Sequence, residues 1–462
     1  MDSMEMSAAD REVLGRAALQ WVLRYFDAAA EPPVYPPVTT AGLEAIVREA
    51  LPQDPQDLDA VFEQFATLAA LGRNNGHPRM FGYVQSSGSF AGVVADFLTS
   101  ALNQNVTSWR SAPSATAVEH QVLDWMKALS GFAPSAGGIL LSGGSLANFA
   151  GLAVAVRASS SADINQDGVG ALPGAPRIYS SAMTHMSTPK ASAMLGLGRA
   201  AVRLVPVDSV FRMDVAALAG MIAEDRAAGR HPVCVVANAG DVNTGAVDPL
   251  DAIADVCAEL GVWFHVDGSY GGFAAQAPRA AQALAGIGRA DSLSLDPHKW
   301  LFAPLDVGCL LVRAPLALAR PFTQGASYVD VIADRDMSDF AFWDHGPELS
   351  RRFRALKIWF ILKCHGARAI LDAIDDNIAV AQRLAGAVDA SDDFERLAPS
   401  PLSIVCFRYA PPSLRGDGEA YLSNAMIGDD FALRACVVNY RTTSADTESV
   451  LATIRRVAAR AA

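Results

Sequence analysis

The stretch Asp291-Ser-Leu-Ser-Leu-Asp-Pro-His-Lys-Trp300 decides the fold, and Lys299 is its central residue. Leu293 and Leu295 alternate with small polar residues, which predicts a buried strand that Pro297 ends. A lysine directly after a buried strand is unusual, because an ammonium group is rarely buried without a partner or a function. A desolvated lysine is a competent amine and forms Schiff bases with carbonyl compounds. An exposed lysine at a strand end explains this decapeptide equally well, so the rest of the chain must choose between the two.

Composition excludes several classes of protein. The chain has 462 residues, of which 51% are hydrophobic and 19% charged, as in a globular protein with a large core. This length accommodates two or three domains. The net charge is −12, and no lysine or arginine cluster exceeds a short pair such as Arg455-Arg456. Nucleic acid and anionic membrane surfaces are therefore not expected as partners.

The sequence also predicts a cytoplasmic location. Acidic residues in the first ten positions and the lack of an apolar run there argue against a secretory signal. The uncharged stretch 128–156 is interrupted by Pro134 and two glycine pairs, so we expect a strand, a turn and a helix instead of a membrane span. The six cysteines are spread singly through apolar segments, as is typical of reduced core thiols.

The first 75 or so residues are predicted to be helical. Apolar residues recur with helical spacing over 11–26 and 58–71, and the proline-rich stretch 32–37 joins them as an extended connector. Such a segment does not form a core alone, so we expect it to pack on another domain or a second subunit. The polar stretch 77–89 follows, whose aromatics are either core residues or the wall of a pocket.

From residue 138 onward the pattern is that of an α/β protein with a largely parallel sheet. Strands are expected at 139–141, 177–180, 201–206, 233–238, 262–266 and 292–295, and helices at 149–157, 189–197, 213–228, 250–260 and 278–286. Ligands bind at the carboxyl ends of the strands in such sheets. The residues with chemical potential lie at or just past those ends: Ser145, His185, Asn238, Asp267, His298 and Lys299.

Two motifs at these ends suggest binding. Ser142-Gly-Gly-Ser-Leu-Ala-Asn148 lies between a strand and a helix, where small residues leave backbone N–H groups free for an anion, although most such turns merely connect. Phe264-His-Val-Asp-Gly-Ser-Tyr-Gly-Gly272 places Asp267 at the end of an apolar strand. Asp267 either caps the following turn or pairs with a cationic ring nitrogen.

Beyond residue 310 the pattern changes to a smaller α/β unit. A loop at 323–329 precedes a long amphipathic helix that starts near Ser350. Strands are expected at 403–407 and 433–440, and a final helix at 447–461.

Together these motifs resemble the pyridoxal-phosphate-dependent group II amino-acid decarboxylases, which include aromatic-amino-acid and glutamate decarboxylases. The resemblance extends from His77 to about residue 445. It implies the α/β architecture of fold type I, as in aspartate aminotransferase, with a mainly parallel seven-stranded sheet in the large domain. The implied parts are an N-terminal helical segment (1–76) exchanged in a homodimer, a large cofactor domain (77–360) and a small C-terminal α/β domain (361–462).

The resemblance also implies roles for individual residues. Lys299 would carry the internal aldimine of pyridoxal 5′-phosphate, Asp267 would keep its pyridine nitrogen protonated, and His185 would stack on its ring. Tyr328 would be the proton donor on a mobile catalytic loop. His298 would have either a functional role in the site or a structural one as a donor to the phosphate. The implied cofactor-binding set comprises Lys299, Asp267, His185, Gly144, Ser145, Leu146, Asn238, Ser269, Ser292 and His298. No metal site is expected.

The reaction implied is decarboxylation of an L-amino acid to an amine and CO₂, with an aromatic substrate (tyrosine, tryptophan, phenylalanine or DOPA) favoured. The substrate pocket would comprise Phe81, Tyr83, Gln85, Ser86, Thr107 and Ser350. One alternative is an aromatic aldehyde synthase, although His185 and Tyr328 together favour simple decarboxylation. A second alternative is decarboxylation of glutamate, aspartate or 2,4-diaminobutyrate, and Thr107 favours this alternative. Ser269 and the short segment 410–418 depart from the family pattern.

Overall fold

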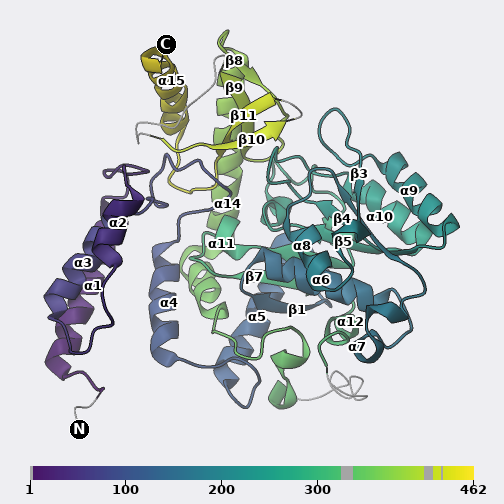
Figure 1. Ribbon diagram of the computed structural model, residues 1–462, viewed down its shortest axis with the longest axis horizontal. Helices are drawn as coiled ribbons and strands as arrows, with labels where there is room; N and C mark the ends of the chain where they lie inside the picture. Colours follow the sequence, from purple (N-terminus) through teal and green to yellow (C-terminus); the bar gives the residue numbers. More distant parts are fainter. Residues whose placement is uncertain (1–3, 324–336, 410–419, 428–429, 462) are drawn as a thin grey trace.

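A seven-stranded sheet forms the centre of the computed structural model, which describes residues 4–323, 337–409, 420–427 and 430–461. Its strand order is β1-β7-β6-β5-β4-β2-β3 (Figure 1). The strands are β1 (Gly137–Leu141), β2 (Pro176–Ser181), β3 (Val202–Val205), β4 (His231–Asn238), β5 (Trp263–Asp267), β6 (Ser292–Leu295) and β7 (Gly308–Val312). Only β7 runs antiparallel to its neighbours, β1 and β6, so the predicted mainly parallel sheet is confirmed.

Helices cover both faces of this sheet, as parallel strands joined by crossovers require. Helices α6 (Gly144–Ala158) and α8 (Ser187–Met194) contact each other on one face, while α5 (Pro113–Ser130), α9 (Val215–Ala227) and α10 (Leu250–Leu260) lie on the other. The alternation along β5 shows the two faces: Phe264 and Val266 enter the main core, and His265 faces α6.

One predicted helix is wrong. Residues 278–286 form a series of turns, with hydrogen bonds such as Leu284 N to Ala280 O but no continuous helix. Pro278 and Gly286 bound this alanine-rich stretch closely, and Arg279 is held by Asp375 of the long helix α14. Tertiary contacts therefore override a high helix propensity here.

A second, antiparallel sheet of order β10-β11-β9-β8 forms the C-terminal part. Its strands are β8 (Phe394–Arg396), β9 (Ile404–Tyr409), β10 (Ser423–Ile427) and β11 (Asp430–Cys436). The end of α14 (Ala355–Asp389) and α15 (Ser444–Ala461) pack on it. The predicted boundary at 360/361 falls within α14, close to the kink at Gly366 with φ +80°. We propose that this kink is where the large domain gives way to the small one.

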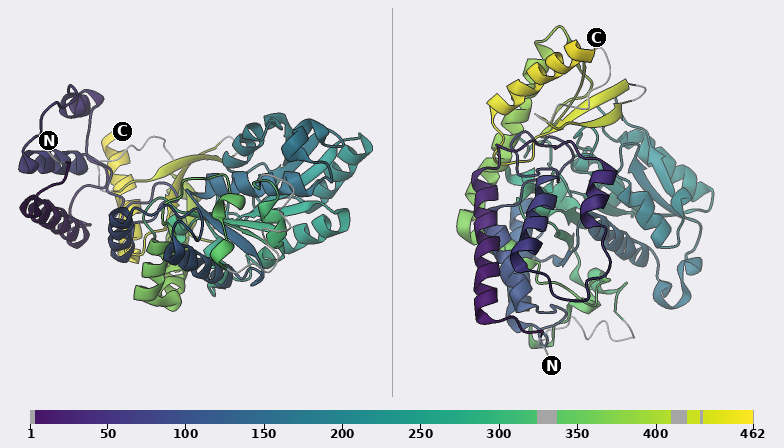
Figure 2. Two further views of the ribbon diagram at one scale, coloured as in Figure 1. Left: turned by 90° about the horizontal axis from the view of Figure 1, so that it is seen from below. Right: turned by 60° about the vertical axis from the view of Figure 1, so that its left-hand side comes forward.

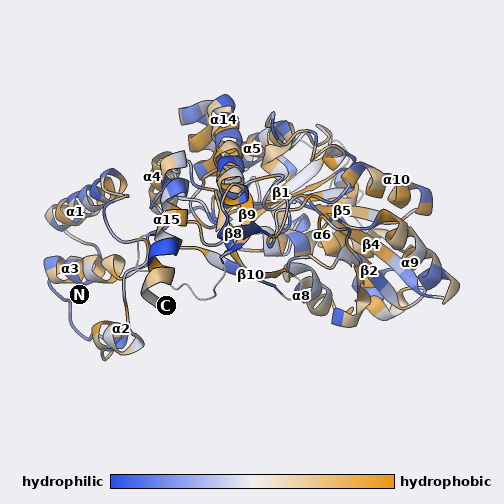
Figure 3. Ribbon diagram, turned by 90° about the horizontal axis from the view of Figure 1, so that it is seen from above, coloured by the Kyte–Doolittle hydropathy of each residue, from blue (hydrophilic) through white to orange (hydrophobic). Residues whose placement is uncertain are grey.

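The N-terminal helices α1 (Ala8–Asp27), α2 (Thr40–Val47) and α3 (Leu58–Ala70) contain no buried residue. Figures 2 and 3 show them set apart from the body of the molecule, beside α4 (Phe90–Leu102). Phe97 of α4 is 70% exposed, and Leu102 is 54% exposed. This arrangement agrees with the prediction that the segment forms no core alone.

Two further expectations concern membranes and cysteines. No helix within the described ranges is both long and apolar enough to span a membrane. All six cysteines are free, and five are buried, but Cys364 is exposed, so the prediction that every thiol lies in the core is wrong for that one. Cys364 lies two residues before the kink of α14, in a part of the helix that faces outward.

Candidate active site

Lys299 lies in the short helix α11 (Pro297–Trp300), directly after β6. Proline suits the first helical position because it has no N–H to leave unpaired, so the strand turns sharply into α11. The Lys299 side chain is 22% exposed, and its Nζ lies 3.0 Å from Oδ2 of Asp296. It opens into a cavity of about 610 Å³ at the carboxyl ends of the strands. The prediction placed the site at this edge.

Asp267 lies in the same cavity and is held as a carboxylate. The strand register aligns it with Asn238 of β4 and Ser294 of β6. Its Oδ1 accepts hydrogen bonds from Ser294 Oγ and Ser269 N, both 3.1 Å away, and its Oδ2 accepts one from Asn148 Nδ2 at 2.7 Å. Burial alone would raise the pKa of Asp267, but the Lys299 ammonium and the Ser269 donors hold that pKa below its ordinary value.

A buried hydrogen-bond network fixes Asn148, and it explains where Ser292 lies. Since Asn148 Nδ2 donates to Asp267, its Oδ1 must accept from His265 Nε2, 3.0 Å away. Burial lowers the pKa of His265 to about 4, so this ring is neutral and its Nδ1 accepts from Ser292 Oγ at 2.8 Å. Trp263 Nε1 in turn donates to Ser292 Oγ.

Ser292 therefore does not line the cavity, contrary to its predicted role as a phosphate contact. Ser292 and Ser294 face the same side of the sheet, but Ser292 lies two residues nearer the amino end of β6. Two residues of strand span roughly 6–7 Å, which is enough to remove a side chain from the site. Ser294 takes the position beside Asp267 instead.

The turn at residues 142–146, which was predicted to bind an anion and is called the phosphate turn below, closes the cavity at the start of α6. Gly143 has φ +142°, which favours glycine. A Cβ on Gly144 would lie 2.4 Å from Ser269 Oγ and 2.6 Å from Asp296 Oδ2. The helix N-terminus therefore faces a tight cradle with no room for a side chain, and such a cradle suits an anion.

Two predicted histidines line the cavity. His185 Nδ1 accepts a hydrogen bond from Ser187 N at 3.2 Å, and burial lowers the pKa of the ring, which is thus neutral. Its Nε2 has no hydrogen bond to any residue of the described ranges, and the side chain lines the cavity. Burial also lowers the pKa of His298, whose Nδ1 accepts from Val307 N. Asn238 is fixed by donating its amide to Ser181 Oγ and Asp248 Oδ2.

The structure brings most of the predicted cofactor-binding set together. Nine residues of that set line the cavity: Gly144, Ser145, Leu146, His185, Asn238, Asp267, Ser269, His298 and Lys299. The cavity also contains residues that the sequence reasoning missed, namely Asn148, Lys190, Asp296 and Arg434. Asp296 could have been found, because it is a carboxylate three residues before Lys299. Arg434 carries no local signal, since it reaches the cavity from β11 of the small domain.

The predicted substrate pocket is dispersed in this chain. Only Tyr83 lines the cavity, in a left-handed conformation with φ +66°. Phe81 is fully buried in the core of the small domain, and Gln85 accepts a hydrogen bond from Arg73. Ser86 Oγ donates to His298 O behind the lysine.

Thr107 and Ser350 also lie outside the cavity. Thr107 is buried, with its Oγ1 3.0 Å from Ser111 Oγ, and Ser350 is exposed. Ser350 precedes Arg351, whose side chain is buried in an ion pair with Glu119, so the backbone enters the core directly after Ser350. Tyr328, the predicted proton donor, lies outside the described residues.

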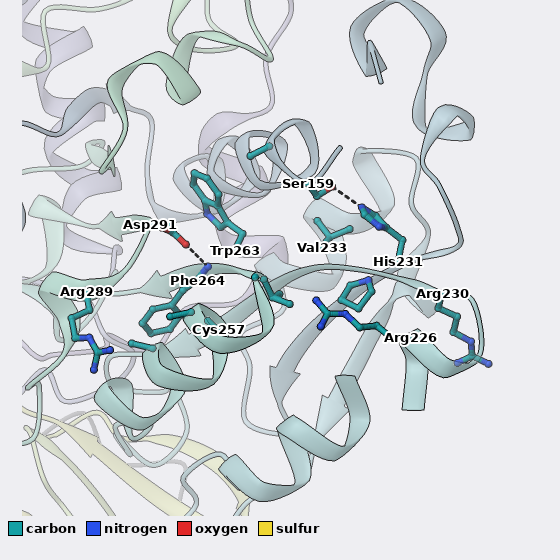
Figure 4. Close-up of a pocket in the computed structure, with 16 residues that line it drawn as sticks. Ser159, Arg226, Arg230, His231, Val233, Cys257, Trp263, Phe264, Arg289 and Asp291 are labelled. Carbon is teal, nitrogen blue, oxygen red and sulfur yellow. Dashed lines mark hydrogen bonds between the residues drawn. The ribbon is translucent and has the colours of Figure 1, made fainter. Parts of the chain in front are cut away.

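A second cavity of about 580 Å³ lies at the opposite, amino-terminal edge of the sheet (Figure 4). Its polar groups have partners within the protein: His231 Nε2 hydrogen-bonds with Ser159 Oγ, and Asp291 Oδ2 accepts from Phe264 N. Arg230 and Arg289 form ion pairs with aspartates outside the cavity. Arg226 donates to the carbonyl of Leu260. No lysine is among the described residues that line this second cavity. The chemistry therefore belongs to the cavity around Lys299.

Lys299, Asp267 and the phosphate turn define a class of enzyme. The lysine can bind a carbonyl, the carboxylate can keep a ring nitrogen protonated, and the cradle at Gly144 can take a phosphate. Pyridoxal 5′-phosphate carries all three groups, so the residues present fit that cofactor. No cluster of metal-binding side chains is found in the described parts of the chain.

The chain belongs to the family described as the pyridoxal-dependent decarboxylase conserved domain, whose model matches residues 42–410. It is a pyridoxal-phosphate-dependent amino-acid decarboxylase. An aromatic-L-amino-acid decarboxylase from Bacillus atrophaeus is 34% identical, over 99% of this chain and 97% of that protein. A phenylacetaldehyde synthase from a Rosa hybrid cultivar is 28% identical, over 92% and 89%. Tryptophan decarboxylase from Catharanthus roseus, solved with L-tryptophan, superposes with a TM-score of 0.90 at 27% identity, covering 98% of this chain and 99% of that one.

The tight cradle at Gly144 predicts that one added methyl group there strongly lowers the affinity for the cofactor. In Gly144→Ala the new Cβ would lie 2.6 Å from Asp296 Oδ2, so the turn must shift, and we expect the affinity for pyridoxal 5′-phosphate to fall at least about tenfold, a cost of about 1.4 kcal/mol. Fluorescence titration of the apoenzyme measures this. Gly220→Ala in α9, where a Cβ meets nothing within 4 Å, is the matched control. Equal affinities for both variants would contradict the assignment of the turn.

Proposed function

We propose that this decarboxylase converts an aromatic L-amino acid to its amine and CO₂. The single observation that carries this proposal is the cavity in which Lys299, Asp267 and His185 converge at the end of β5 and β6. The substrate class is supported by the Bacillus atrophaeus relative, which matches along nearly the whole chain. It is also supported by Tyr83, an aromatic side chain that is 45% exposed at the cavity.

Each residue of the site has a proposed task. Lys299 holds the cofactor through its nitrogen, and the phosphate turn binds the phosphate with backbone N–H groups. Asp267 holds a proton at the ring nitrogen, and three donors from Asn148, Ser294 and Ser269 keep its carboxylate in place. When bound, the cofactor takes up the electron pair that remains after CO₂ leaves.

Two cavity residues would handle the substrate. His185 is held by Ser187 and presents a neutral ring to the cavity, where it would stack on the cofactor and orient the departing carboxylate. Arg434 is 6% exposed and is anchored by Ser423 Oγ at 2.9 Å, so its cationic guanidinium would attract the α-carboxylate into the cavity. Tyr328 remains our proposed proton donor to the α-carbon.

We infer that the working enzyme is a homodimer located in the cytoplasm. Support for the homodimer comes from the N-terminal helices, which bury no residue in this chain, and from Phe97 and Leu102 on the exposed face of α4. A second copy would also bring side chains to the open side of the cavity, where this chain supplies only one of the six predicted pocket residues. Light scattering that gives a monomer mass would contradict the homodimer.

The substrate experiment incubates the holoenzyme with a panel of L-amino acids and quantifies CO₂, amine, H₂O₂ and ammonia together. We expect tyrosine, tryptophan, phenylalanine or DOPA to give equal amounts of CO₂ and amine. H₂O₂ and ammonia in step with CO₂ would instead indicate an aldehyde synthase, the activity named for the Rosa relative. Preference for glutamate, aspartate or 2,4-diaminobutyrate would overturn the aromatic assignment while leaving the decarboxylase intact.

A further inference from the structure

Asp296 is a buried carboxylate between Lys299 and the phosphate turn. It is 3% exposed, and its Oδ2 lies 3.0 Å from Lys299 Nζ and 3.6 Å from His298 Nε2. Its Oδ1 is also buried and has no hydrogen-bond partner in the portion of the chain that the structure describes. A buried carboxylate with one oxygen unpaired is costly unless a ligand completes its contacts.

The carboxylate lies against the place where a phosphate would bind. A Cβ on Gly144 would come within 2.6 Å of Asp296 Oδ2, so this oxygen touches the start of α6. The N-terminus of this 15-residue helix attracts negative charge. Asp296 and a bound phosphate would therefore share one small region of positive potential.

Few positive charges face this carboxylate. The titratable groups around it are Lys299 and His298 of α11, His185 before α8, Cys309 of β7 and Asp267 of β5. Burial lowers the pKa of both histidines and raises that of Cys309, so these three are neutral near pH 7, while Asp267 is negative. Among the described residues, the cation in contact with Asp296 is the Lys299 ammonium, while Lys190 and Arg434 line the same cavity.

We propose that Asp296 takes up one proton when the phosphate of the cofactor binds. Two like charges that share a buried site cannot both stay ionised without a large cost, and a protonated carboxyl has an O–H that can donate to the phosphate. The cofactor affinity of the enzyme then falls as pH rises, because each binding event consumes a proton. This inference rests on the proposed roles of Lys299 and the phosphate turn, but not on the identity of the amino-acid substrate.

Calorimetry of cofactor binding counts the proton directly. Apoenzyme is titrated with pyridoxal 5′-phosphate at one pH in buffers of different ionisation enthalpy, and the slope of heat against that enthalpy gives the protons taken up. We expect the wild type to take up about one proton more than Asp296→Asn, so that the wild-type affinity falls up to about tenfold more per pH unit. Asp291→Asn, at the opposite end of the same strand, is the matched control and should behave as the wild type.

A second ligand distinguishes the effect of the phosphate on proton uptake from the effect of the bond to Lys299. Pyridoxal has the aldehyde that Lys299 binds but no phosphate, so its binding should show the same proton uptake in the wild type and in Asp296→Asn. Equal uptake by the two proteins with pyridoxal 5′-phosphate would overturn the proposal. So would an equal difference with pyridoxal, since the proton would then follow Lys299.

Wild-type protein alone provides a test that does not depend on the variant folding. Difference infrared spectra of apoenzyme and holoenzyme should gain the C=O stretch of a protonated carboxyl group on loading with pyridoxal 5′-phosphate, but not with pyridoxal. No such band with pyridoxal 5′-phosphate would also overturn the proposal. All these measurements omit amino acids, so failure of the substrate assignment would leave them unchanged.

Discussion

Lys299→Ala is expected to lower kcat for decarboxylation by at least roughly 10²–10⁴-fold, the range that a positioned proton-transfer group alone contributes. The lysine would also hold the cofactor covalently, so its loss removes a bond as well as an acid–base group. The Nζ atom lies 3.0 Å from Asp296 Oδ2 and opens into the cavity that Asp267 and the phosphate turn also line. Lys190 lines the same cavity from α8, so residual cofactor binding in Lys299→Ala would point to that lysine. The visible absorbance of the lysine-bound cofactor should disappear together with turnover.

The matched control for this variant is Lys363→Ala, which removes an exposed lysine of α14 that lies over the Trp359 ring, away from the cavity. It should leave both kcat and absorbance unchanged. Turnover near the wild-type level in Lys299→Ala would mean that the cofactor is held by another group. Circular dichroism of each variant confirms that the fold is retained.

Asp267→Asn is expected to reduce kcat by about 10²–10³-fold, the effect of removing one preorganised electrostatic group from an active site. The substitution keeps the shape of the side chain but removes the charge that would keep a ring nitrogen protonated. The three donors around the carboxylate, Asn148 Nδ2, Ser294 Oγ and Ser269 N, would then face an amide that accepts through only one oxygen. Steady-state kinetics with the best substrate of the panel measures the loss.

Cofactor content distinguishes the two roles that Asp267 could have. If the carboxylate acts on the ring nitrogen, Asp267→Asn loses kcat while Lys299 still holds the cofactor in full stoichiometry. Loss of cofactor in proportion to activity would show that Asp267 only shapes the site, as a cap of the following turn would. Asp291→Asn serves again as control, since Asp291 holds Phe264 N at the far end of the sheet.

The fold and the positions of Lys299 and Asp267 could be predicted from the sequence because each leaves a signal in the residues next to it. Leu293 and Leu295 mark a buried strand, Pro297 marks its end, and Lys299 follows at once, so strand and lysine are adjacent in the chain as well as in space. Asp267 and the glycines at 143 and 144 have the same property. Each lies at a junction between a strand and the next element, where parallel sheets place their ligands.

The substrate side of the site could not be predicted in the same way. Phe81, Thr107 and Ser350 belong to loops whose direction is set by long-range packing, and the structure places Phe81 in the small-domain core. Arg434 reaches the cavity from β11, more than 130 residues beyond Lys299 in the chain, and a strand residue there has no local mark of function. The helix predicted at 278–286 fails for a related reason, since Arg279 is fixed by Asp375 of α14.

The sequence by itself determined the mainly parallel sheet and the positions of Lys299 and Asp267 at the ends of its strands. The two side chains are marked by the order of apolar, small and charged residues over ten positions or fewer, and the sheet by the alternation of strands and helices from residue 138 to 295. Both patterns are visible without coordinates. Only the tertiary structure decided that Ser294, and not Ser292, lies beside Asp267, and that Asp296 touches the phosphate turn. Both depend on strand register and on the approach of α6 to β6, and those are set by packing between segments about 150 residues apart.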